Sequence, residues 1–212
     1  MKLMISAGPT REAIDPVRFI TNHSSGKMGY ALAEAAVAAG YDVTLVSGPV
    51  NLKQPDGLAE FVPVISAADM ASAVKSRFPE MDAFISCAAV ADYRPVEVAA
   101  QKIHKQDGDM VLRLERTEDI LFSLGRMKKP HQLLIGFAAE TEDLRARALG
   151  KMERKNLDWI AANTVGVPGR GFQADTNAVT LYARSGAVVD FPLTDKKTLA
   201  EQMLQTIFEK KG

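Results

Sequence analysis

The sequence contains a single cysteine, Cys87, among its 212 residues. One cysteine excludes a disulfide within the chain and any metal site built from several cysteines. An excess of either charge is also missing, because 26 lysines and arginines balance 26 aspartates and glutamates. A chain without net charge has no global attraction for nucleic acid or a membrane surface, so any site for an anion must be local.

Long apolar runs are absent as well. No stretch of about eighteen apolar residues is available to cross a membrane, and no charged-then-apolar leader opens the chain. We therefore expect a cytoplasmic protein that binds neither a membrane nor nucleic acid. With 47% hydrophobic and 25% charged residues, the chain has the composition of an ordinary globular domain with a full core.

Strand-like apolar runs alternate with helical patterns along most of the chain. Parallel strands are predicted at residues 1–7, 42–46, 61–65, 83–89, 133–138 and 159–162, and a further strand at 110–114. Helices are predicted at residues 28–39, 67–77, 119–127, 140–155 and 196–210, and a loop at 96–106. This alternation predicts an α/β fold, with a Rossmann-like, mainly parallel sheet covered by helices on both faces. Ligands of such sheets bind at the carboxyl ends of the strands.

The pattern changes near the end of the chain. Residues 178–183 and 187–191 flank Arg184, Ser185 and Gly186, which is typical of a β-hairpin. We expect one domain over residues 1–212, with 166–195 as a hairpin appendage.

The stretch from Thr21 to Gly29 joins the first strand to the first helix and is rich in small and polar residues. A helix start of this kind favours phosphate, because its N–H groups are unpaired and its dipole end is positive. The alternative is a plain glycine- and serine-rich connection. The stretch is not a Walker A loop, since Met28 follows Lys27 where serine or threonine is needed, and it is not a dinucleotide fingerprint, which would directly follow the strand.

Other polar groups follow predicted strands: Asp92, the segment 137–141, and the lysine pair Lys151 and Lys155. Two lysines four residues apart repel each other slightly unless an anion lies between them. Alternatively, Asp92 is a turn former and the lysines form a solvated face. Cys87 is more typical of a buried structural thiol than of a nucleophile. The three histidines lack the spacing of a zinc site.

Five motifs together resemble one family. They are SAGPTREAIDPVRFITNHSSGKMG (6–29), LVSGP (45–49), AAVADYR (88–94), GFAAET (136–141) and KMERKNLD (151–158). The chain is identified by them as a member of the bacterial CTP-dependent phosphopantothenoylcysteine synthetases of coenzyme A biosynthesis, which are commonly fused behind a flavin-dependent decarboxylase. The likeness runs nearly from end to end.

The resemblance implies roles for individual residues. Asn22 matches the asparagine that steadies an acyl-cytidylate intermediate, and Lys102 matches a lysine on a flap over the site. Positions that match nucleotide-binding residues are Ser86, Cys87, Ala88, Asp92, Lys102, Phe137, Lys151 and Lys155, together with the segment Glu115, Arg116, Thr117 and Glu118. The flap departs from the family pattern at His104, where the family has lysine.

The resemblance further implies a ligase that joins 4′-phosphopantothenate to cysteine and converts CTP to CMP and pyrophosphate. Mg²⁺ would arrive with CTP, and no metal would be held by the protein alone. A homodimer that uses the late hairpin is implied, and so is a separate or fused decarboxylase; no FMN is expected on this chain. Two other hypotheses remain, a nicotinamide-dependent reductase and a non-catalytic nucleotide-binding subunit. Fold alone does not separate the three.

Overall fold

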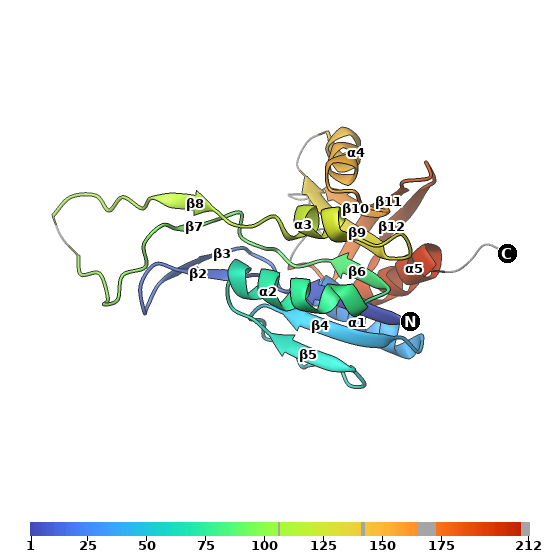
Figure 1. Ribbon diagram of the computed structural model, residues 1–212, viewed down its shortest axis with the longest axis horizontal. Coiled ribbons are helices and arrows are strands. Elements are labelled where there is room, and N and C mark those ends of the chain that lie inside the picture. The colour runs from blue at the N-terminus through green and yellow to red at the C-terminus, as the bar shows by residue number, and fades with distance from the viewer. Residues whose placement is uncertain (106, 141–142, 165–172, 209–212) are drawn as a thin grey trace.

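The computed structural model describes residues 1–105, 107–140, 143–164 and 173–208. Within these ranges, eight strands form one sheet in the order β12-β11-β10-β9-β6-β1-β4-β5 (Figure 1). The strands are β1 (Lys2–Ala7), β4 (Asp42–Ser47), β5 (Glu60–Pro63), β6 (Ala83–Ser86), β9 (Leu133–Glu140), β10 (Trp159–Thr164), β11 (Thr176–Ala183) and β12 (Val188–Asp195). From β10 to β5 every neighbouring pair is parallel. The predicted Rossmann-like sheet is confirmed.

Helices cover both faces of the sheet, as predicted. They are α1 (Lys27–Ala38), α2 (Ala67–Arg77), α3 (Ile120–Met127), α4 (Leu144–Arg154) and α5 (Lys196–Phe208). Side chains of a strand point alternately to the two faces. Leu3 and Ile5 of β1 accordingly join the core formed with α1 and α5, whereas Met4 joins the core formed with α2, α3 and α4. None of the described helices is long and apolar enough to span a bilayer.

The predicted late hairpin is present, and it extends the central sheet. β11 pairs antiparallel with β10 on one side and with β12 on the other. The helix α5 that follows packs beside α1 on the same face of the sheet. Whether this hairpin forms a dimer contact stays a prediction, and residues 165–172 before it lie outside the described residues.

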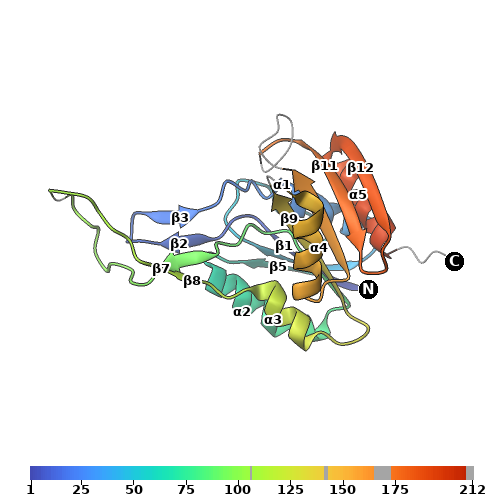
Figure 2. The same ribbon diagram turned by 90° about the horizontal axis from the view of Figure 1, so that it is seen from above.

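Two short ribbons lie outside the main sheet. β2 (Arg11–Ala13) pairs with β3 (Phe19–Thr21), and β7 (Tyr93–Pro95) pairs with β8 (Leu114–Arg116). In Figures 1 and 2, β7, β8 and the described chain between them project far from the sheet; we call residues 93–105 and 107–116 the arm. The strand predicted at residues 110–114 is wrong: only Leu114 belongs to a strand, because Met110 and Val111 are exposed and have no sheet to pack against.

Several other boundaries also differ from prediction. Strand β6 ends at Ser86, since the chain then turns along the loop after β1. The helix predicted from Glu140 begins at Leu144, because Glu140 still pairs in β9 with Thr164. The end of the last predicted helix, beyond Phe208, lies outside the described residues.

Candidate functional site

The loops after β1 and β6 are bonded to each other at the centre of the sheet. Ala89 N donates to Gly8 O at 2.9 Å, and Thr10 N donates to Ala89 O at 3.2 Å. Thr10 Oγ1 also accepts from Ala91 N at 2.9 Å. The strand order reverses between β1 and β6, since β4 and β5 follow on one side of β1 and β9 and β10 on the other side of β6. Parallel sheets bind ligands outside such a switch point.

Helix α1 begins beside these loops and approaches the sheet closely. Its N-cap, Gly26, has a φ of 79°, and no side chain caps the helix. A Cβ on Gly29 would lie 2.5 Å from Ala7 Cβ, so only glycine allows this contact between helix and strand. The sequence thus directs the N-terminus of α1 toward the carboxyl end of β1, where an anion is favoured.

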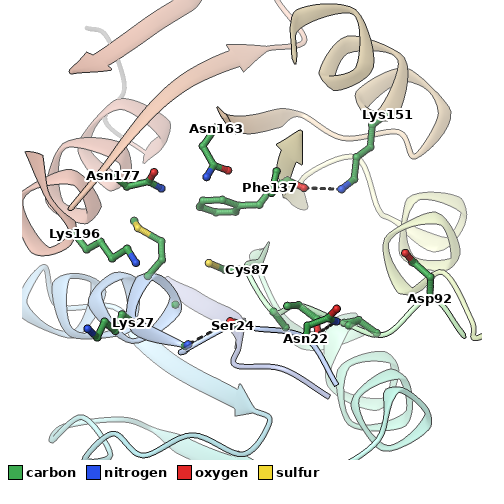
Figure 3. A pocket seen from close by; sticks show the side chains of 17 residues that line it. Asn22, Ser24, Lys27, Cys87, Asp92, Phe137, Lys151, Asn163, Asn177 and Lys196 are labelled. Carbon is green, nitrogen blue, oxygen red and sulfur yellow. Dashed lines mark hydrogen bonds between the residues drawn. The ribbon is translucent and has the colours of Figure 1, made fainter. Parts of the chain in front are cut away.

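A cavity of about 400 Å³ lies at this place. It is lined by Asn22, Ser24, Gly26, Lys27, Met28, Gly29, Cys87, Ala88, Ala89, Val90, Asp92, Phe137, Ala139, Lys151, Asn163, Asn177 and Lys196. Figure 3 shows Lys27, Lys196 and Asn177 on one side of Phe137, and Lys151 and Asp92 on the other.

A smaller cavity of about 140 Å³ adjoins it and shares Ala88, Val90, Asp92, Phe137 and Lys151. Its remaining lining comes from Ser86, the segment 117–121 and Lys155. This segment includes the start of α3, where the Asp119 side chain accepts from Phe122 N at 3.1 Å. The smaller cavity therefore combines a helix N-terminus with two lysines.

The lysines are held in place by specific contacts. Lys151 Nζ donates to Phe137 O at 2.6 Å, and Lys155 Nζ lies 2.7 Å from Asp119 Oδ2. Lys155 and Lys151 lie at the end of α4, so the helix C-terminus favours their positive charges. Because both lysines come from the same end of α4, they line the cavities on the same side.

The structure gathers most of the residues that the sequence predicted. Ten of them line one cavity or both: Asn22, Ser86, Cys87, Ala88, Asp92, Thr117, Glu118, Phe137, Lys151 and Lys155. Lys102, Glu115 and Arg116 line neither, and all three are exposed on the arm. The roles assigned to all thirteen stay predictions.

Lys102 is followed by Ile103, whose main chain is hydrogen-bonded to Asp15 and Arg18. Ile103 N donates to Asp15 Oδ2 at 3.1 Å, and Arg18 Nη2 donates to Ile103 O at 2.6 Å. This part of the arm is thereby tied to the turn between β2 and β3.

Among the lining residues that the sequence did not predict, three carry polar side chains in the larger cavity: Asn163, Asn177 and Lys196. Asn163 could have been found, because it follows the apolar run of a predicted parallel strand. Asn177 and Lys196 carry no such signal, since they belong to the antiparallel edge and its following helix. Their place in the cavity depends on how β11 docks on β10.

Cys87 lies between the two sides of the larger cavity (Figure 3). Burial raises the pKa of its thiol to about 12, and the positive charge of Lys196 offsets only part of that rise. A thiol that stays protonated at neutral pH is a poor nucleophile. The prediction of a structural role for its sulfur is thus consistent with its surroundings.

Fold and site define the class of protein: a Rossmann-like α/β protein with a polar, lysine-containing cavity at the switch point of its sheet. The family model "DNA/pantothenate metabolism flavoprotein C-terminal domain" matches residues 1–210. The chain belongs to this family.

Individual relatives agree with this assignment. The coenzyme A biosynthesis bifunctional protein CoaBC of Bacillus subtilis is 56% identical over 205 residues, covering 97% of this chain and 50% of the relative. The chain thus spans about half the length of the curated relatives it matches. The crystal structure of a C-terminal domain of CoaBC has a TM-score of 0.83 and 48% identity, over 97% of this chain and 93% of that domain. A mutant of Cab2 in complex with phosphopantothenate-cysteine shares the fold, with a TM-score of 0.75 and 17% identity over 97% of this chain and 84% of its own.

Proposed function

We propose that this chain is a CTP-dependent phosphopantothenate–cysteine ligase of coenzyme A biosynthesis. The observation that carries the proposal is the convergence of Asn22, Asp92, Phe137, Lys151 and Lys155 on two joined cavities at the switch point of the sheet. Membership of a pantothenate-metabolism family supports it, and so does the ligand named for the Cab2 complex.

The nucleotide is assigned to the side with Phe137 and the α4 lysines. Phe137 offers a partly buried ring against which a base can lie. Lys151 and Lys155, with the N–H groups at the start of α3, would neutralise and bind phosphate oxygens. When the nucleotide binds, Lys155 would leave its ion pair with Asp119 and bind a phosphate oxygen, since the carboxylate and the phosphate both accept hydrogen bonds from its ammonium group.

Asp92 suits a divalent cation that arrives with the nucleotide. Its exposed carboxylate borders both cavities and makes no ion pair among the described residues. Mg²⁺ is usually held by one or two carboxylates together with substrate phosphates. When bound, the ion would neutralise phosphate charge, and Asp92 is the residue of this chain that would hold it.

The reaction requires activation of a carboxylate, which is a poor electrophile. An oxygen of the 4′-phosphopantothenate carboxylate attacks the α-phosphorus of CTP, and pyrophosphate leaves with the electrons of the broken P–O bond. The resulting acyl-cytidylate then reacts with the amine of cysteine, and CMP leaves. Asn22 would stabilise the oxygen of the intermediate, because a neutral amide donor does not titrate.

Two further parts of the proposal concern assembly. We expect a homodimer with the β11–β12 hairpin as a contact, and a decarboxylase that is fused or separate, which would carry the FMN. The CoaBC relatives, twice as long as their matched part, support the fused arrangement.

The test is a mass-resolved assay with CTP, Mg²⁺, 4′-phosphopantothenate and cysteine, beside a control without cysteine. We expect phosphopantothenoylcysteine in the first and acyl-cytidylate with pyrophosphate in the second. CTP binding without either product would instead favour the non-catalytic nucleotide-binding subunit.

The nicotinamide-dependent reductase is less well supported. The strand order is that of dinucleotide-binding sheets, but β4 ends at Ser47 and is followed by Gly48 and Pro49, where an acidic residue would hold the ribose. Tight NADPH binding in a fluorescence titration would restore this alternative.

A further inference from the structure

The larger cavity has a second polar end, away from the α4 lysines. Lys196, Asn177 and Asn163 line this end, on the side of Phe137 opposite to Lys151 (Figure 3). They come from β11 and β10, the second and third strands from the β12 edge of the sheet, and from α5, which packs against β11 and β12. We call them the edge residues.

Lys196 gives this end a buried positive charge. Only 6% of the residue is exposed, and its Nζ donates to Ala174 O at 2.5 Å. Lys27 adds a second charge nearby; its own carboxylate partner, Asp175, is 85% exposed at the side chain. Burial and the charge of Lys27 both lower the pKa of Lys196. A bound carboxylate would offset both effects, because it would pair with the ammonium group away from water.

Asn177 gives the same end an unused acceptor. The residue is 4% exposed, and its Oδ1 has no hydrogen-bond partner within the described part of the chain. Buried polar atoms without a partner are uncommon in folded proteins and costly. The acceptor therefore calls for a ligand that donates an N–H or O–H group.

A cation beside an unused acceptor fits an α-amino acid better than a phosphate. The carboxylate of an amino acid accepts from ammonium groups, and its amino group donates. A phosphate group or pyrophosphate ionised at neutral pH offers mainly acceptor oxygens, which would leave Asn177 Oδ1 unsatisfied.

Resting on the function proposed above, we propose that the edge residues bind the incoming cysteine. Lys196, assisted by Lys27, binds the α-carboxylate, and Asn177 Oδ1 accepts a hydrogen bond from the α-amino group. The amine reaches the acyl carbon at Asn22 from the side opposite the nucleotide. As a free amine, its lone pair forms the new C–N bond, the carbon–oxygen bond to the phosphate breaks, CMP leaves with that electron pair, and the nitrogen loses one proton to solvent.

The first test needs no variant and compares cysteine with cysteamine, which lacks the carboxylate. Both are supplied to the wild-type chain after acyl-cytidylate has formed. A charge-assisted contact to the carboxylate should make kcat/KM for cysteine about tenfold to a hundredfold higher. Equal reactivity of the two amines would overturn the proposal.

Two substitutions separate the two contacts. In Lys196→Met, the preference for cysteine over cysteamine should fall toward one, because only cysteine uses this charge. In Asn177→Leu, both amines should lose reactivity by a similar factor, since both have the amino group. Lys197→Met is the matched control, because Lys197 is the neighbouring lysine on α5 and is exposed; it should leave the preference unchanged.

Release of pyrophosphate without cysteine distinguishes failure of this proposal from failure of the proposed function. It should be unchanged in Lys196→Met and Asn177→Leu. If these variants instead raise KM for CTP and slow pyrophosphate release, the edge residues serve the nucleotide and the proposal is wrong, while the ligase function stands. If the wild-type chain releases no pyrophosphate, the function is wrong and the cysteine site is wrong with it. Should either variant fail to fold, the comparison of cysteine with cysteamine on the wild-type chain still tests whether the carboxylate is bound.

Discussion

Asn22 Nδ2 donates a hydrogen bond to the main-chain oxygen of Ala89 at 2.9 Å. This contact joins the loop after β3 to the loop after β6, and both loops line the larger cavity. The side chain of Asn22 is exposed, so this bond, not burial, sets the orientation of its amide. The orientation of the Asn22 side chain therefore depends on its Nδ2–H donor, which an aspartate would lack.

We expect Asn22→Asp to slow the second half-reaction about a hundredfold to a thousandfold, as is typical when a positioned donor is lost. An aspartate cannot donate to Ala89 O, and its charge repels the oxygen that the amide would stabilise. Acyl-cytidylate should then accumulate in quenched-flow samples analysed by mass spectrometry. Equal slowing of both half-reactions would contradict the assigned role.

Gly29→Ala should destabilise the fold by about 1–3 kcal/mol, the usual range for overpacking a core. The new methyl group would lie 2.5 Å from Ala7 Cβ, so α1 would have to move away from β1. Urea unfolding followed by circular dichroism measures the change. The control is Gly150→Ala in α4, where the added Cβ meets nothing within 4 Å; it should stabilise the chain by up to about 1 kcal/mol. Equal effects of the two substitutions would show that α1 does not approach β1 this closely.

Cys87 should resist alkylation. With a pKa of about 12, about one thiol in ten thousand is ionised at pH 8, and the thiolate is the reactive form. The rate of iodoacetamide labelling, followed by mass spectrometry, should be at least about a thousandfold lower in the folded chain than in urea. Rapid labelling of the folded chain would contradict the raised pKa of this thiol.

Asp15 should make stability depend on pH in the acid range. Its side chain is fully buried, and the Arg18 guanidinium, with main-chain N–H groups of Ile103, Val17 and Arg18, holds the pKa of Asp15 well below its usual value. A lowered folded-state pKa contributes stability above the unfolded pKa near about 4, and this stability is lost as the pH falls toward the folded value. Asp15→Asn should therefore be less stable than the wild type at pH 7.

The difference between wild type and Asp15→Asn should narrow below about pH 4, because the Asp15 carboxylate of the unfolded wild type becomes protonated there while that of the folded chain stays ionised. Free energies of unfolding from urea titrations between pH 3 and 7 measure it. A difference that stays constant over this range would show that the ionised carboxylate is not the source. Because Asp15 also binds Ile103, limited proteolysis of the arm should be faster in the variant at pH 7.

Much of the central sheet could be predicted because its signals are local. The helix predicted over 67–77 agrees with α2 at both ends, and Ser66 and Asp69 form a capping box at its N-terminus. The arm could not be predicted, since a strand-like pattern becomes a strand only where a partner is available. Residues 110–112 alternate like a strand but project from the molecule without one.

The candidate site likewise contains residues that local sequence patterns predict and residues that they do not. The parallel sheet, the glycine-rich start of α1 and the motifs that carry Asn22, Phe137 and Lys151 can be predicted from the sequence, because periodicity and motifs are properties of neighbouring residues. That Asn177 and Lys196 share a cavity with these residues follows from the tertiary structure alone. Their position results from the antiparallel pairing of β11 with β10 and the packing of α5 against α1, and contacts between segments so far apart in the chain leave no local pattern.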